Sequence, residues 1–309
     1  VGFKNVRGVA FLGADFETFF PHKDKKAVRQ FYGVDPNINL IGFVSRNQPR
    51  KLYPDLFIGF KKFLETTTPE LAKKTFLVIH SSFPDQQPWD FPRLIKNLGI
   101  SHKVLFTYIC HSCHNISLKP WQDIKSLCSK CNAYNTKLPN NILGVNNQQL
   151  NDIYNMMDIY VQYANSEGIG IGQLEAASCG VPLMAVNYSG MEDVVKKLGA
   201  YPVNYHKLTC EIATMCMRAV PNDDHFAEQL NKFFQLPEDM RRKRSENTLK
   251  LAKEVCDWDK CAAEWDRVID MCPIRPIMST WGRKPRIHQP QTQIPANLSP
   301  QQLVNYLIL

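Results

Sequence analysis

The chain has 309 residues, of which 44% are hydrophobic and 21% charged, a composition typical of a globular protein with one large domain or two small ones. It holds no run of eighteen apolar residues, which excludes a membrane-spanning helix. The net charge of +8 suits a phosphate-bearing ligand, nucleic acid or an anionic membrane surface. The one dense basic cluster, at residues 241–244, is interpreted as a solvated helix face.

Short apolar runs alternate with amphipathic stretches from about residue 39 onward, and this alternation predicts a parallel α/β sheet. We expect strands at residues 40–45, 75–80, 103–108, 141–145, 158–162 and 182–186. We expect helices near residues 54–65, 90–97, 148–157, 170–179 and 190–197. Because the strands are apolar on both faces, helices should cover the sheet on each side.

The pattern changes after residue 205, where it predicts helices through to about Met271, with Asp257 as the N-cap of the last one. Residues 272–309 are expected to form a Pro-rich tail, in which Ser299 is the N-cap of a short terminal helix. The apolar residues of this helix either dock on another surface or belong to a frayed terminus.

Two Cys-x-x-Cys knuckles separated by fourteen residues lie after the third predicted strand. Their cysteines are Cys110, Cys113, Cys128 and Cys131. Four thiolates from two such knuckles form a tetrahedral zinc site with no open position for water. We therefore predict a structural Zn²⁺ insert at residues 109–138, with His111 and His114 as bystanders. A redox role fits less well, because a redox Cys-x-x-Cys normally stands alone at a helix start.

Six further cysteines are scattered along the chain. Cys179 and Cys216 lie in apolar segments, where a free thiol behaves as a small hydrophobic group. This usage favours a reducing, cytoplasmic environment over a disulfide-bonded one.

Residues 165–176 hold the largest group of candidate ligand-binding residues. Three glycines follow an apolar strand and open a helix, so that a ligand can approach bare N–H groups at a positive helix end. Glu167 lies in the loop, and Glu175 lies about two turns into the helix. A carboxylate accepts hydrogen bonds from paired hydroxyls, so these two could bind two sugars. The alternatives are that the glycines serve tight packing and that Glu175 is a solvated helix residue.

The spacing Glu-x7-Glu from Glu167 to Glu175, followed by Ala-Ala-Ser-Cys-Gly-Val-Pro, resembles the donor-site signature of retaining family-four glycosyltransferases of the GT-B fold, the glycosyl transferases group 1. Four other stretches resemble this family in the same order: residues 12–21, 42–51 with an Arg-x4-Lys phosphate loop, 150–162 and 258–265. The resemblance covers about residues 10–270, is interrupted by the zinc insert, and implies a Rossmann-like sheet.

Site residues follow from the resemblance. It implies that Arg46 and Lys51 bind the donor diphosphate and stabilise the leaving nucleotide, so that no catalytic metal is expected. It implies that Glu167 binds the transferred sugar, that Glu175 binds the ribose, and that the anomeric configuration is retained. The remaining donor contacts would come from Gly144 and Val145, both against the nucleobase, and from Gly168, Ile169, Gly170, Ile171 and Gly172, whose N–H groups face phosphate and sugar.

A GT-B enzyme binds its acceptor in a first Rossmann-like domain and its donor in a second. The resemblance therefore divides this chain into a leading segment at residues 1–38, from an acceptor domain that is otherwise missing, and a donor domain at residues 39–271. We expect the rim around Glu167 to be covered by a partner chain, another copy, or the tail. Two alternatives stay open: a non-catalytic module of this fold within a larger assembly, and a nucleic-acid-associated protein, although few Lys or Arg residues flank the cysteines.

Overall fold

The computed structural model describes residues 10–83, 85, 88–122, 125–140, 142–272, 299 and 302. The chain divides into two compact units, Val1–Trp265 and Asp266–Leu309, and the sheets lie in the first. The predicted tail lies outside the described residues except for Cys272, Ser299 and Gln302. There the Gln302 N–H donates to Ser299 Oγ at 3.3 Å, as the predicted N-cap requires.

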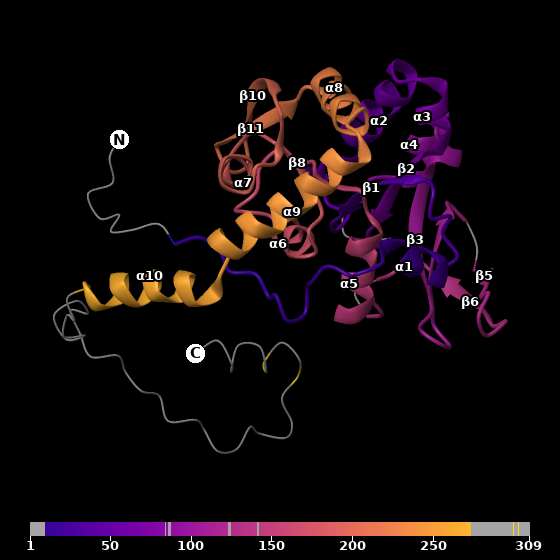
Figure 1. Cartoon of the computed structure of the whole chain (residues 1–309), viewed down its shortest axis with the longest axis horizontal. Helices are drawn as coiled ribbons and strands as arrows, with labels where there is room; N and C mark the ends of the chain where they lie inside the picture. The colour runs from indigo at the N-terminus through magenta and orange to yellow at the C-terminus, as the bar shows by residue number, and fades with distance from the viewer. Residues whose placement is uncertain are drawn as a thin grey trace. The chain divides into compact units, whose positions relative to one another are not determined.

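The described residues form one sheet of nine strands and a separate two-stranded hairpin (Figure 1). The strands of the large sheet are β1 Asn39–Val44, β2 Thr75–His80, β3 Val104–Cys110, β4 Ile116–Pro120, β5 Ser126–Leu127, β6 Tyr134–Lys137, β7 Ile159–Gln162, β8 Leu183–Val186 and β9 Tyr201–Val203. Six of them form a parallel core in the order β3-β2-β1-β7-β8-β9. The strands β4 and β6 pair antiparallel with β3, and β5 pairs with β6.

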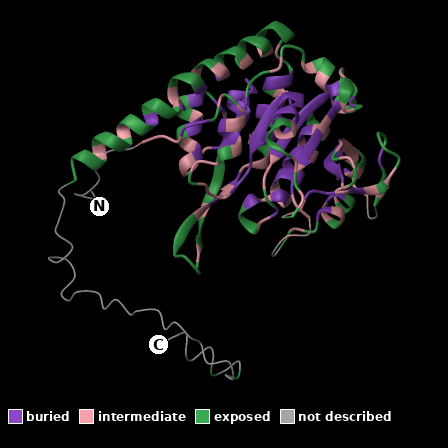
Figure 2. Cartoon of the chain, turned by 90° about the horizontal axis from the view of Figure 1, so that it is seen from below, coloured by how far each residue is buried: buried purple, intermediate pink, exposed green. Residues whose placement is uncertain are grey.

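Helices cover both faces of this parallel core, as the apolar strands predict. The helical elements are α1 Lys25–Phe31, η1 Pro49–Lys51, α2 Tyr53–Thr66, α3 Pro69–Lys74, α4 Phe91–Asn97, η2 Ser101–Lys103, α5 Asn147–Met156, α6 Ile171–Ser178, α7 Gly190–Leu198, α8 Asp223–Phe234, α9 Glu238–Val255 and α10 Trp258–Asp270. One hydrophobic cluster joins the sheet to α2, α4 and α8, and a second joins it to α5, α6 and α9. Figure 2 shows the result: buried strands at the centre and exposed residues on the outer helices.

Two of the expected elements are wrong. No strand forms at residues 142–145, because the Asn140 side chain accepts hydrogen bonds from the N–H groups of Ile142 and Leu143 at 2.8 and 2.9 Å and bends the chain into a turn. Residues 205–221 are not helical but form the hairpin of β10 Tyr205–Glu211 and β11 Cys216–Pro221. The N-cap prediction is confirmed, since Asp257 Oδ1 accepts the Lys260 N–H at 3.0 Å.

The N-terminal segment is attached to α5 by polar contacts. Asn151 and Asn155 accept the N–H groups of Phe20 and His22 at 3.1 and 2.7 Å. His22 and the hydroxyl of Tyr32 both contact the buried Asp152 carboxylate, at 2.7 and 2.6 Å. Residues 20–32 therefore pack against α5. Within the described residues, no helix combines the length and the apolar character that crossing a membrane requires.

Candidate functional site

The order of strands in the parallel core reverses between β1 and β7. The chain runs outward from β1 through β2 to β3, and then outward in the other direction from β7 through β8 to β9. In open α/β sheets, ligands bind in the crevice outside the carboxyl ends of the strands at such a switch point. The loop after β1 and the loop after β7 meet there, and the Asn165 N–H donates to the Arg50 carbonyl at 3.0 Å. The topology thus joins two segments that are more than a hundred residues apart in the sequence.

Lys51 and Glu167 form the centre of this crevice. The Lys51 ammonium donates to Glu167 Oε1, and the side chains are 9% and 8% exposed. The Arg50 guanidinium binds the other carboxylate oxygen at 2.7 Å and is 45% exposed. Burial lowers the pKa of Lys51, and the Glu167 carboxylate acts in the opposite direction. Two cations therefore converge on one carboxylate.

Arg46 lies elsewhere. Its guanidinium binds both carboxylate oxygens of Asp85, at 2.8 and 3.2 Å, and is 54% exposed. The structure thus brings together Lys51 and Glu167 of the predicted catalytic set, with Arg50 beside them in place of Arg46. Sequence reasoning missed Arg50 in this role, although η1 at Pro49–Lys51 puts it directly before Lys51.

The glycine loop leads from Glu167 into α6. Gly170 is the residue before the helix and has φ 78°, a left-handed conformation that glycine adopts without strain. A cavity of about 690 Å³ opens along this loop. It is lined by Arg50, Lys51, Glu167, Gly168, Ile169, Gly170, Ile171 and Gly172, by Gly190 and Asp193 of α7, and by Ala10, Phe11 and Leu12 of the N-terminal segment. The predicted phosphate-binding backbone and the two cations therefore face one space.

The other predicted donor residues lie outside this lining. Glu175 accepts a hydrogen bond from the Tyr154 hydroxyl at 2.6 Å. Burial raises the pKa of Glu175, and this hydrogen bond lowers it in part. Gly144 and Val145 lie in the loop before α5, and neither lines the cavity. The assignments of ribose to Glu175 and of the base to Gly144 and Val145 stay predictions.

A second cavity, of about 640 Å³, lies on the other side of the same loop and shares Arg50, Glu167 and Gly168 with the first. Its further walls are Ser166, Tyr188, Ser189, Cys216, Met217 and Arg218. Arg218 binds Glu211 at 2.7 Å and donates to Ser166 Oγ, which fastens the hairpin to the loop. The sequence did not predict that Cys216, Met217 and Arg218 line a cavity, because its pattern after residue 205 predicted helices.

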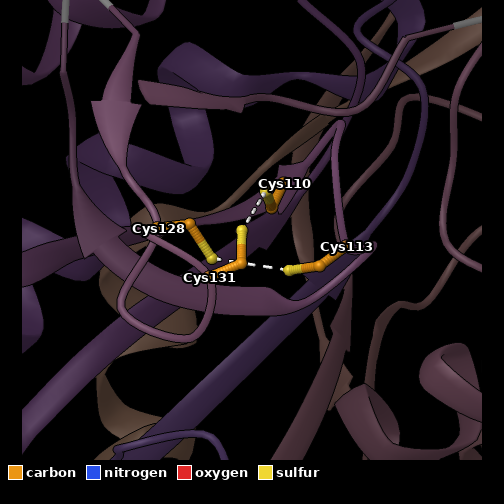
Figure 3. A group of neighbouring side chains, drawn as sticks. All are labelled: Cys110, Cys113, Cys128 and Cys131. Carbon is orange, nitrogen blue, oxygen red and sulfur yellow. Dashed lines mark hydrogen bonds between the residues drawn. The ribbon is translucent and has the colours of Figure 1, made fainter. Parts of the chain in front are cut away.

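The four cysteines of the insert form one cluster (Figure 3), with Cys110 at the end of β3, Cys113 in the turn between β3 and β4, and Cys128 and Cys131 in the loop between β5 and β6. All four Sγ atoms lie within 4.8 Å of one another. The pairs Cys110–Cys131 and Cys113–Cys128 are each 3.6 Å apart, and all four thiols are free. Neither His111 nor His114 belongs to the cluster. The predicted set of four sulfur atoms is therefore brought together.

The two knuckles have the same backbone geometry. In each, the residue after the second cysteine has a left-handed φ, 56° at His114 and 57° at Asn132. Its N–H donates to the carbonyl of the first cysteine, at 2.9 Å to Cys110 and 3.0 Å to Cys128. The N–H two residues after each first cysteine also lies 3.4 Å from that cysteine's sulfur. The sequence thus folds twice into a turn that points two sulfur atoms at a common centre.

These sulfur positions fit a tetrahedral metal ion. With Zn–S bonds of about 2.3 Å, two sulfur ligands at the tetrahedral angle are about 3.8 Å apart; two of the six sulfur pairs here are 3.6 Å apart, and all six lie within 4.8 Å. Burial raises the pKa of Cys110, but the N–H groups of Cys113 and Ser112 lower it to a net value of about 6. The pKa of Cys113 is instead raised to about 12, because burial and hydrogen bonds to neighbouring thiols outweigh the lowering by the Asn115 N–H. Four thiolates this close together would repel one another, so all four would ionise together only where a cation binds them.

Comparisons with known proteins agree with this geometry. Residues 125–251 match the family model Glycosyl transferases group 1. The D-inositol 3-phosphate glycosyltransferase 2 of Catenulispora acidiphila is 27% identical over 186 residues, which are 59% of this chain and 35% of that protein. The chain therefore spans about a third of the length of the curated relatives it matches.

Two solved structures show the same fold. Anabaena Alr3699/HepE in complex with UDP and glucose has a TM-score of 0.58 and 14% identity, over 86% of this chain and 57% of that one. The C-terminal domain of the glycosyl transferase group 1 family protein LpcC from Francisella tularensis has a TM-score of 0.52 and 16% identity, over 79% of this chain and 99% of that one.

The fold and the site thus define a Rossmann-like α/β protein with GT-B neighbours. Within that class, residues 125–251 match the glycosyl transferases group 1 model, and the curated relatives to which the chain is similar are named glycosyltransferases.

Proposed function

We propose that this chain is the donor-binding half of a glycosyltransferase that uses a nucleoside diphosphate sugar. The observation that carries the proposal is the convergence of Lys51, Arg50 and Glu167 beside the glycine loop that opens α6, at the switch point of the sheet. The group 1 match supports it, as do relatives named glycosyltransferases and a fold neighbour in complex with UDP and glucose.

The cations bind the diphosphate in this proposal. Lys51 and Arg50 are the cations of the cavity lining, which also holds the carboxylates of Glu167 and Asp193, so a diphosphate that enters competes with Glu167 for them. The N–H groups at the start of α6 add the positive end of a helix dipole. As the sugar leaves, charge develops on the diphosphate, and cations already in place stabilise it. Catalysis then needs no metal ion, and Arg46 joins the site only by leaving Asp85.

The carboxylates bind the sugars. Glu167 lies between the two cavities, where it accepts hydrogen bonds from hydroxyls of the transferred sugar. Glu175, supported by the Tyr154 hydroxyl, accepts those of the ribose, and Gly144 and Val145 lie against the base. The acceptor then attacks on the face that the nucleotide leaves, which retains the anomeric configuration.

The cysteine cluster holds a structural zinc ion. Cys110, Cys113, Cys128 and Cys131 supply four sulfur ligands, so no position remains for a substrate. The bound metal ties the end of β3 to the loop between β5 and β6 and stabilises the antiparallel edge of the sheet. The free thiols elsewhere in the described chain agree with a reducing, cytoplasmic location.

Binding and transfer are separable in this proposal. Orienting donor and acceptor together lowers the barrier to sugar transfer by roughly 7–11 kcal/mol. A site that binds only one of the two reactants does not lower the barrier in this way. The acceptor site therefore belongs to a further domain or a partner chain. We expect the 309-residue chain to bind donor and to transfer sugar only when that second component is added.

Calorimetric titration of the chain with UDP, GDP, ADP and their glucose or mannose derivatives tests the proposal. Binding of at least one nucleoside diphosphate is expected, with tighter binding of a matching nucleotide sugar. Absence of binding by the whole panel would overturn the donor site and favour a non-catalytic module of the same fold. Efficient transfer by this chain alone would show that the acceptor site lies within it.

A further inference from the structure

Ser189 has a backbone conformation that is ordinarily reserved for glycine. It lies between β8 and α7, with φ 54° and ψ −142°. In this region the Cβ atom of an L-residue crowds its own backbone, so the conformation is strained and persists only where surrounding contacts enforce it. A glycine at this position would be free of that strain. The serine side chain must therefore contribute something that glycine cannot.

The Ser189 hydroxyl closes a small ring with the backbone of Glu167. Its oxygen accepts the Glu167 N–H at 2.9 Å and donates to the Glu167 carbonyl at 3.1 Å. The N–H of Gly190 donates to the same carbonyl at 3.1 Å. A Cβ atom built on Gly190 would lie 1.7 Å from the Gly168 carbonyl oxygen, so the two backbones are in direct contact. Both backbone polar groups of Glu167 are thus held by Ser189 and Gly190, the N-cap and the first residue of α7.

This attachment matters because a donor would disturb two of the three side chains that hold the Glu167 carboxylate. In the structure, Lys51 and Arg50 bind the carboxylate, and the buried Gln162 side chain also donates to it at 3.2 Å. A diphosphate that binds those two cations competes with the carboxylate for them. The loop that follows, residues 168–170, has glycine at two of its three positions and offers few side chains to hold itself. The backbone bonds to Ser189 are independent of the cations and persist when phosphate arrives.

We propose that Ser189 is a positioning residue, which holds the Glu167 backbone so that the carboxylate faces the transferred sugar while Lys51 and Arg50 bind the diphosphate. This role rests on the proposed donor site. The strained conformation of Ser189 is retained because only a residue with a hydroxyl makes both bonds to Glu167. Ser189 lines the second cavity together with Glu167, so it lies where the transferred sugar would be recognised.

Two substitutions separate positioning from stability. Ser189→Gly removes the hydroxyl and relieves the strain, whereas Ser189→Ala removes the hydroxyl and keeps the strain. Ser189→Gly should melt at or above the wild-type temperature, and roughly 2–10 °C above Ser189→Ala. In both variants the Glu167 amide should exchange its hydrogen roughly tenfold faster or more, because its acceptor is gone. Ser189→Gly carries the test even where Ser189→Ala unfolds.

The functional readout is the ratio of the Kd of the free nucleoside diphosphate to that of its sugar derivative, for the nucleotide that the wild type binds. The ratio should fall roughly tenfold in both variants, while the Kd of the free diphosphate stays within about twofold. Met215→Gly is the matched control, because Met215 has the same φ of 54° at an exposed turn of the hairpin. This substitution should raise the melting temperature and leave the ratio unchanged.

The outcomes are distinct. An unchanged ratio or unchanged exchange of the Glu167 amide in Ser189→Gly overturns the positioning role while leaving the donor site in place. The ratio of the two Kd values could instead follow stability, so that it is preserved in Ser189→Gly and lost in Ser189→Ala. That result would assign Ser189 a purely structural role and overturn the proposal. A wild type that binds no nucleotide overturns the donor site itself.

Discussion

Replacing Lys51 by Ala tests the donor site at its centre. The Lys51 side chain is 9% exposed and lines the cavity, so its ammonium would bind a diphosphate in a largely desolvated setting. A hydrogen bond to a charged group contributes about 1.5–3 kcal/mol. Its loss should raise the Kd of a nucleoside diphosphate by roughly 10- to 150-fold. Glu167 keeps Arg50 as its partner in this variant, so the fold should survive.

Thermal melting measures the weaker nucleotide binding of Lys51→Ala as a smaller ligand-induced rise in melting temperature. At a ligand concentration of about 100 times the wild-type Kd, binding stabilises the native state by about 2.7 kcal/mol. At the same concentration the variant should gain only about 0.3–1.4 kcal/mol. With about 2–4 °C per kcal/mol for a domain of this size, the melting temperature should rise by roughly 5–11 °C in the wild type and roughly 1–6 °C in the variant.

Three further substitutions make the assay specific. Lys62→Ala is the matched control, because Lys62 lies on α2 in an ion pair with Asp224 at 2.6 Å and lines neither cavity at the switch point. It should leave the ligand-induced shift unchanged. Arg50→Ala should reduce the ligand-induced rise in melting temperature. Arg46→Ala should leave this rise near the wild-type value, because the Arg46 guanidinium of the wild type binds Asp85. Equal shifts for the wild type and Lys51→Ala would refute the reasoning.

Three other predictions follow from the same structure. Elemental analysis should find about one zinc per chain, and Cys128→Ser should lose it while the nucleotide-induced shift persists; metal-free folded protein with four free thiols would contradict the zinc site. Glu175→Gln should weaken nucleotide binding by about 1.5–3 kcal/mol in calorimetry, and an unchanged affinity would remove the ribose assignment. Burial, with Asp223 nearby, raises the pKa of Asp55 to about 6. The folded state therefore binds that proton more tightly than the unfolded chain, and the protein loses stability as the pH rises from about 4 to 6. Asp55→Asn should therefore stabilise the protein by about 1–2 kcal/mol at pH 7 in urea unfolding and much less at pH 4, and an equal effect at both would contradict this.

Local pattern was sufficient for much of the fold. The strand at residues 75–80 was predicted at its observed bounds, because a continuous apolar run between helices has few other solutions in an α/β chain. The zinc ligands were also predictable, since two Cys-x-x-Cys knuckles each determine a local turn. Errors arose where side chains redirected the backbone, as Asn140 does, and where residues 205–221 formed a hairpin whose polar and apolar residues do not alternate cleanly.

The site itself was decided by tertiary structure. By itself the sequence indicated Glu167 and the glycine loop from residue type and spacing, and it indicated Lys51 through the resemblance of residues 42–51 to a phosphate loop. The adjacency of β1 and β7 determined that Arg50 rather than Arg46 meets Glu167, because a guanidinium pairs with the carboxylate that folding brings near. Folding also determined that Ser189 holds the Glu167 backbone, a contact between residues 22 apart that depends on β8 lying beside β7. Long-range contacts of this kind depend on the order of strands in the sheet, which no local pattern of residues encodes.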